Sequence, residues 1–345
     1  MCKGIVIAFF KWGLVAFLLS QNFVAHAQAE AKTSYSPRIN GTIRTKFEYQ
    51  PTPRQVRIGV RNARLSATGL VSDWMSYKVE GDLFDQGEMK MLNAHIRLGP
   101  IGNTDLKMGF MRVPFTIDAH RTPDLLYFAN RSFIAKQVGS IRDVGATIRY
   151  NLKTKFPLVI EAGLFSGAGF AFHKDFWTDR INYAAKLQSS LPLGLKLSLS
   201  TQKCRPTDTD MYMYDAAFSY SDDRWHAEIE CLRKYYQGGA FDPVLAYNIF
   251  ASYSLPLEQR IRRISFLARY DYMDDHSNGK LNENGQLNVT DYARHRATAG
   301  ITLGLASKPF VSEIRINYEK YFYRPGAIVK RSEQDKFLIE FMARF

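Results

Sequence analysis

Six cationic side chains in the first half of the chain could bind small anions. Arginine suits this chemistry because its planar guanidinium donates two parallel hydrogen bonds to a phosphate or carboxylate group. In a narrow passage such contacts strengthen, although too many of them would trap the ion. Each candidate could instead pair with a carboxylate such as Glu80 or Asp82 and merely hold a loop, and the sequence leaves this alternative open. The favoured candidates are Arg61, Arg64, Arg121 and Arg131, followed by Arg112 and Lys136.

The chain lacks the patterns expected of an enzyme or a metalloprotein. A hydrolase needs a nucleophile with a base nearby, whereas the histidines are scattered and none joins a serine in a recognisable string. The loop at 274–285 has Gly285 where a calcium-binding loop requires a glutamate. We therefore expect no catalytic residue, no cofactor and no metal site.

Alternation of polar and apolar residues between turn clusters predicts the elements that hold these cations. It gives one continuous series of sixteen strands, each close to the 9–11 residues that a tilted membrane strand needs. The expected fold is therefore all-β, a 16-stranded antiparallel transmembrane β-barrel. The strands are expected at Arg38–Tyr49, Val56–Leu70, Trp74–Leu83, Met89–Leu98, Asp105–Pro114, Asp143–Leu152, Pro157–Phe165, Tyr183–Leu191, Leu195–Lys203, Met211–Tyr220, Trp225–Tyr236, Leu245–Leu255, Ile264–Tyr272, Tyr292–Leu303, Ser312–Tyr323 and Asp335–Phe345.

The connections between these strands alternate in length, with tight turns such as 71–73 and 192–194 on one rim and long loops on the other. This is the arrangement of porins, with short periplasmic turns and long extracellular loops. The third long loop, 115–142, carries many apolar residues that would be poorly placed in bulk water. A loop of this length needs a role of its own. We expect it to fold inward and narrow the pore.

Within the second strand, the apolar positions change parity, from 56, 58 and 60 to 63, 65 and 67. One extra residue near 61–63 would restore the pattern, which predicts a β-bulge there. Arg57, Arg61 and Arg64 would then all point into the lumen. On the predicted lumen face of the whole barrel, which also includes Arg44 and Lys46, basic residues outnumber acidic ones.

Both ends of the chain are typical of an exported protein. Residues 1–27 have the lysines, short apolar core and Ala25-His26-Ala27 site of a signal peptide, cleaved near Ala27. The barrel would then comprise 28–345. The last strand alternates to a terminal aromatic residue, Phe345, with Phe337 and Phe341 on the same face. That face is expected to meet outer-membrane lipid, and the strand to be recognised by the outer-membrane assembly machinery.

The charge of the chain favours anionic solutes as partners. Its net charge is +13, and removing 1–27, which contains Lys3, Lys11 and no acidic residue, leaves +11. Exported chains rarely meet nucleic acid, so we expect a lumen that attracts anions. Cys204 and Cys231 remain after cleavage. Export permits a disulfide between them, and the sequence leaves their pairing open.

The stretch at 107–145 resembles the phosphate-selective porins O and P. The strand 107–115 runs into Pro114-Phe115, the loop carries Asn130-Arg131-Ser132, and the next strand begins Arg142-Asp143 with Gly145. Upstream, the family's Arg-Arg-Ala stretch corresponds to 61–63. Asn130 and Asn62 depart from the family, where an acid and a second arginine are found. The resemblance implies a sixteen-stranded, homotrimeric porin whose third long loop forms the constriction.

Together these observations predict an outer-membrane porin through which small solutes, preferably anions such as phosphate, diffuse passively. The alternative from another class is a closed barrel that acts as a receptor or an anchoring protein. Single-channel conductance separates the two.

Overall fold

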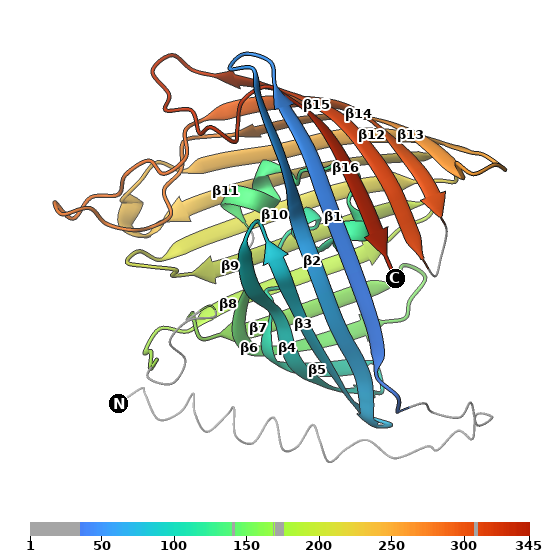
Figure 1. Ribbon diagram of the computed structural model, residues 1–345. Coiled ribbons are helices and arrows are strands. Elements are labelled where there is room, and N and C mark those ends of the chain that lie inside the picture. The colour runs from blue at the N-terminus through green and yellow to red at the C-terminus, as the bar shows by residue number, and fades with distance from the viewer. Residues whose placement is uncertain (1–34, 140–141, 168, 170–175, 307–309) are drawn as a thin grey trace. The chain divides into compact units, whose positions relative to one another are not determined.

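A computed structural model describes residues 35–139, 142–167, 169, 176–306 and 310–345, so the expected signal peptide lies outside the described residues. Residues 35–345 form one compact unit. It is a closed barrel of sixteen antiparallel strands in which each strand pairs with its neighbours in the chain (Figure 1). The strands are β1 (Arg38–Gln50), β2 (Gln55–Ser72), β3 (Met75–Asp85), β4 (Glu88–Ile101), β5 (Thr104–Arg112), β6 (Arg142–Leu152), β7 (Leu158–Phe165), β8 (Asn182–Ser190), β9 (Leu195–Cys204), β10 (Met211–Ser221), β11 (Trp225–Tyr236), β12 (Val244–Pro256), β13 (Arg263–Met273), β14 (Arg294–Ala306), β15 (Val311–Tyr323) and β16 (Lys336–Arg344).

The last strand closes the ring, as the sequence predicts. β16, in red, lies between β15 and the blue β1 (Figure 1), with Phe337 opposite Tyr49 and Phe341 opposite Thr45. Phe337 and Phe341 are about half exposed on the outer face, whereas Glu340 between them is fully buried on the inner face. Since side chains alternate across a sheet, this register fixes the facing of the whole strand.

The terminal residue is held by β1. The backbone amide of Phe345 donates to the carbonyl oxygen of Gly41 at 3.0 Å, and the Gly41 amide donates back at 2.8 Å. A Cβ at position 41 would lie 2.2 Å from the ring of Phe345. Gly41 is therefore the residue that lets the terminal aromatic ring lie flat over β1.

The expected bulge in β2 is present. Arg44 of β1 pairs with Asn62, but the next residue, Thr45, pairs with Val60, so Arg61 is the extra residue. The bulge restores the parity of the strand. As a result, Arg57 and Arg64 both reach the inner face, where they contact Glu48 and Asp82.

β5 ends earlier than the sequence predicts. Pro114 was expected in the strand, but pairing stops at Arg112. The chain then turns sharply, because the Phe115 amide bonds to the carbonyl oxygen of Val113 at 2.8 Å and Thr116 has a positive φ of 59°. A proline cannot donate to the sheet ladder, which fits its position just outside the strand.

The segment 113–139 connects β5 to the region before β6 and contains three short helical turns. These are η1 (Asp118–His120), η2 (Pro123–Leu125) and η3 (Ile134–Val138). Phe115, Phe133 and Ile134 are buried in one apolar cluster with inward-facing residues of β11 to β13, among them Leu232, Ala246 and Met273. A second cluster joins Phe128 to Phe250 and Leu267. The apolar side chains of the segment are thus covered by the barrel wall.

A further short turn, η5 (Gln237–Gly239), follows β11. No described helix is long and apolar enough to cross a membrane.

Cys204 and Cys231 are both free, the first buried and the second exposed. Cys204 follows the inward-facing Gln202 on β9, whereas Cys231 lies between the inward-facing Glu230 and Leu232 of β11. The two thiols face opposite sides of the wall, so the disulfide that the sequence left open does not form.

Candidate constriction site

Arginines of the barrel wall hold the backbone of the segment 113–139. The guanidinium of Arg44 donates to the carbonyl oxygen of Ala129 at 2.8 Å, and Lys46 donates to the same oxygen at 2.6 Å. Because helical turns this short leave many carbonyl groups unsatisfied, donors from the wall fix the path of the segment. The other wall donors are Arg269 to Asn130, Arg296 to Arg131 and Arg315 to Pro123, at 2.9, 2.8 and 3.1 Å.

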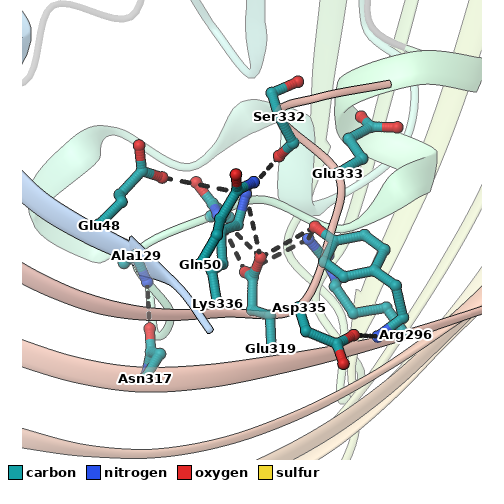
Figure 2. A network of polar contacts seen from close by, with 12 residues as sticks. Glu48, Gln50, Ala129, Arg296, Asn317, Glu319, Ser332, Glu333, Asp335 and Lys336 are labelled. Atoms are coloured by element: carbon teal, nitrogen blue, oxygen red, sulfur yellow. Dashed lines mark hydrogen bonds and ion pairs between the residues drawn. The ribbon is translucent and has the colours of Figure 1, made fainter. Parts of the chain in front are cut away.

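Carboxylates of the wall complete this attachment. Glu230 accepts a hydrogen bond from the Ile117 amide at 2.6 Å. Glu319 accepts from the side-chain amide of Asn130 at 3.0 Å and lies 3.4 Å from Arg296. In Figure 2, Glu319 lies between Arg296 and Lys336, and to one side of them Asn317 accepts from the Ala129 amide. Buried charges that are paired in this way are costly to separate, so the segment is firmly attached to this side of the wall.

Two of the candidate arginines, Arg121 and Arg131, stabilise the segment itself. Arg121 forms a two-pronged ion pair with Glu228 of β11, with one bond of 3.1 Å, and lies 3.2 Å from Asp118. The guanidinium of Arg131 donates to the backbone carbonyl oxygens of Asp118 and Arg121. Arg121 therefore pins the loop through a wall carboxylate, which is the structural alternative that the sequence left open.

Asp118 forms ion pairs with both Arg121 and Arg131. Burial alone would raise the pKa of this carboxyl, but the charges of Arg131 and Arg121 and the amide of Ser132 outweigh it and lower the pKa to about 2. Asp118 also accepts hydrogen bonds from the amide and hydroxyl of Ser132 at 2.9 and 3.0 Å. The carboxylate is thus fully ionised at neutral pH and ties the start of the segment to its end.

Arg61 and Arg64 project from β2 toward carboxylates of β3. Arg61 pairs with Asp85, and Arg64 donates to Asp82 at 3.0 Å and lies 4.0 Å from Glu80. Both side chains keep part of their surface exposed, 29% for Arg61 and 15% for Arg64. They are therefore anchored on one side and accessible on the other.

Four of the six candidates line one cavity of about 190 Å³ between β1, β2 and the segment 113–139. These are Arg61, Arg64, Arg131 and Lys136; Arg112 and Arg121 are not among the lining residues. Among the described residues, those that line this cavity include eight basic residues and one acidic residue. The basic residues are Arg44, Lys46, Arg57, Arg61, Arg64, Arg131, Lys136 and Lys336, and the acidic one is Glu48.

Arg112 occupies a separate position at the end of β5. Its cross-strand partner is Arg142 of β6, and the like charges of Arg142, Arg131 and Arg64 act on it. Lys136 lies 3.4 Å from Glu333 and is 48% exposed. The structure therefore brings Lys136 to the cavity but leaves Arg112 beside it.

Sequence reasoning did not select four basic residues that line the cavity. Alternation placed Arg44, Lys46 and Arg57 on the lumen face, and Lys336 lies at the very start of β16. Pairing of the first strand with the last could have predicted that Lys336 joins the other three, because closing the ring brings it within 3.9 Å of Glu48.

One serine–histidine pair also escaped the sequence patterns. Ser221, at the end of β10, lies 2.6 Å from Nδ1 of His226 on β11. Glu228 lies 3.6 Å from Nε2 of His226 and is already paired with Arg121. The ring of Tyr127 stacks on the imidazole at 4.5 Å. The histidine therefore joins the wall to the segment 113–139.

Several outer-membrane proteins are among the solved structures with the same fold. OmpT of Vibrio cholerae in its trimer form is 14% identical, with 90% of this chain and 98% of that chain covered and a TM-score of 0.59. An anion-selective porin from Comamonas acidovorans is 13% identical, with the same coverage and TM-score. The outer membrane channel DcaP of Acinetobacter baumannii is 13% identical over 93% of this chain and 99% of that chain, with a TM-score of 0.58. No protein-family model and no curated protein matches the chain. At these identities the likeness establishes the fold.

Proposed function

We propose that the chain is a porin of a bacterial outer membrane that lets small solutes diffuse passively and prefers anions. A closed barrel leaves no unpaired sheet edge, which is what a lipid environment demands. The outward positions carry exposed apolar side chains such as Ile43, Ile58 and Phe341. The fold is shared with outer-membrane channels, one of them an anion-selective porin. These observations support a pore in a membrane.

The observation that carries the anion preference is the charge of the 190 Å³ cavity, with eight basic residues against one acidic residue. A passage lined by one sign of charge raises the local concentration of ions of the opposite sign. Of the six candidate cations, four would contact the solute: Arg61, Arg64, Arg131 and Lys136. Arg121 is a positioning residue, and Arg112 lies beside the path.

Most basic residues of the cavity are paired with carboxylates that do not line it, such as Asp82 for Arg64 and Glu340 for Arg44, whereas Arg57 pairs with Glu48, which does line it. Each pair shares its charge between the carboxylate and the cavity, so an anion in the cavity meets a moderate attraction. Conduction requires binding that is weak enough to permit release. The arrangement is therefore suited to passage rather than storage.

Purified protein in planar lipid bilayers tests the proposal. We expect discrete single-channel steps in KCl and a reduction of the chloride current when inorganic phosphate is added. Conductance without any effect of phosphate would remove phosphate from the solutes that bind. A barrel that inserts but stays silent would favour the alternative of a closed receptor or anchoring barrel.

The burial of four charged wall residues supports a narrow passage. Arg296, Arg315, Glu319 and Glu340 are completely or almost completely buried beneath the segment 113–139. Over this part of the lumen the segment excludes solvent, so the passage is confined to the side of β1 and β2. We propose that this narrowing filters solutes by size.

The remaining partners follow from the same proposal. We propose export with cleavage near Ala27, recognition of the Phe345 strand by the assembly machinery, and a homotrimer in outer-membrane lipid. Membership of the phosphate-selective porins O and P stays a prediction. Chemical cross-linking in detergent tests the trimer, and N-terminal sequencing of the mature protein tests the cleavage site.

A further inference from the structure

Glu48 lines three cavities along β1 and β2. It lines the 190 Å³ cavity, a cavity of about 470 Å³ at the rim between the β1–β2 turn and the loop before β16, and one of about 290 Å³ beside Arg61. Of the described residues lining these three cavities, Glu48 is the only carboxylate. Arg57 is the other charged residue that borders all three.

We propose that Glu48 is the specificity-determining residue of the pore: a fixed counter-charge that competes with incoming anions for Arg57 and so limits anion selectivity. The inference rests on the proposed porin function and assigns the regulation of that same passage to one side chain. The ligand class is small inorganic anions, with phosphate as the probe.

The contacts of Glu48 are unequal on its two sides. One carboxylate oxygen accepts from the guanidinium of Arg57, whose side chain is 56% exposed. The other oxygen lies 3.9 Å from Nζ of Lys336, which is buried and held by the Ser332 carbonyl oxygen (Figure 2). Lys336 also lies 3.7 Å from Glu319. Lys336 is thus fixed, whereas Arg57 is free to turn.

Because only Arg57 can move, it can exchange Glu48 for an incoming anion as its partner. A long arginine side chain with half of its surface in water has several rotamers available. When an anion reaches these cavities, Arg57 can turn from Glu48 to the anion, while Lys336 remains next to the carboxylate. The unpaired part of the Glu48 charge then repels the anion and favours its release. Other acids of this wall are engaged away from the path, Asp82 with Arg64 and Asn62 and Asp85 with Arg61 and Lys90.

The direct test is Glu48→Gln, which keeps the shape of the side chain and removes the charge. Reversal potentials in a KCl gradient should give an anion-to-cation permeability ratio that rises about five-fold, the effect of one unit charge in a passage of intermediate dielectric. Phosphate should block the chloride current at a lower concentration. The matched control is Glu88→Gln, a carboxylate that is 70% exposed, pairs with Lys90 and lines none of the three cavities.

A second pair of variants applies if Glu48→Gln fails to fold. Arg57→Gln removes a cation and also releases the charge of Glu48, whereas Arg331→Gln removes a cation of the same rim cavity whose side chain bonds to the neutral Gln55. Arg57→Gln should therefore lower the permeability ratio several-fold more than Arg331→Gln.

The outcomes separate this inference from the proposed function. A silent wild-type barrel overturns the porin proposal, a cation-selective one overturns its anion preference, and either result overturns the inference as well. An anion-selective wild type whose ratio is unchanged in Glu48→Gln, or equal losses in Arg57→Gln and Arg331→Gln, overturns the role of Glu48 alone.

Discussion

Replacing Asp118 by asparagine should loosen the segment 113–139 while leaving the barrel closed. The variant keeps the size of the side chain but loses the charge that Arg131 and Arg121 face at 4.0 and 3.2 Å. The ordinary pKa of 3.8 falls to about 2 at this position. Each pKa unit corresponds to about 1.4 kcal/mol, so the ionised carboxylate stabilises the folded segment by roughly 2 to 3 kcal/mol at neutral pH.

The same values set the pH dependence. Since the pKa in the folded state is the lower one, the stabilisation is complete above pH 3.8 and is lost as the pH falls toward 2. Acidifying the wild type from pH 3.8 toward 2 should therefore loosen the segment 113–139 as the substitution does. In Asp118→Asn, residue 118 no longer titrates, so it should add no pH dependence to the stability of the segment over this range.

Hydrogen exchange measures the effect directly. We take the amides of 113–139 to exchange by local opening of the segment. Asp118→Asn removes the roughly 2 to 3 kcal/mol that stabilises the closed segment, so these amides should exchange roughly 30- to 140-fold faster at neutral pH. The amides of the strands should be unaffected. Asp179→Asn is the control, because Asp179 is 92% exposed and lies 3.8 Å from its neighbour Arg180. Unchanged exchange in the segment would refute the assignment of Asp118 as its central anchor.

Three further changes probe other parts of the account. Arg121→Gln leaves Glu228 buried without its arginine partner, which should weaken the attachment of the segment 113–139 by roughly 3–5 kcal/mol. Larger polyethylene glycols should then enter the pore. An unchanged size cut-off for polyethylene glycol would contradict this role of Arg121. Arg64→Gln removes a charge from the cavity and should lower the anion-to-cation permeability ratio about five-fold, whereas an unchanged reversal potential would make Arg64 purely structural. Phe345→Ala removes the ring over Gly41 and should reduce the amount of barrel in isolated outer membranes; equal amounts would exclude a role of the terminal ring in assembly.

The fold was accessible from the sequence because the pattern that fixes it is local. Each strand alternates between an outer apolar face and an inner face, and the tight turns mark its ends. Even the bulge at Arg61 could be located, since an inserted residue changes the parity of the pattern. Pro114 was misplaced because its apolar side chain fits the alternation, while the backbone turns at Thr116.

The role of Arg121 was harder to predict than that of Arg64, because Arg64 pairs with a carboxylate of the next strand, whereas the partner of Arg121 is distant in the chain. Arg121 pairs with a carboxylate 107 residues away, and Arg44 with one 296 residues away. Nothing in the local pattern indicates which lumen carboxylate a loop arginine will reach. Lys336 came to the cavity through ring closure, which joins the two ends of the barrel. The composition of the lumen was predictable, but the pairing of its charges was not.

The reversal potential of the wild-type channel in a KCl gradient is the most direct test of the central claim. With eight basic residues and one acidic residue around the narrow cavity, chloride should carry most of the current, and the potential should have the sign of an anion-selective pore. A potential of the opposite sign, set by potassium, would contradict the account.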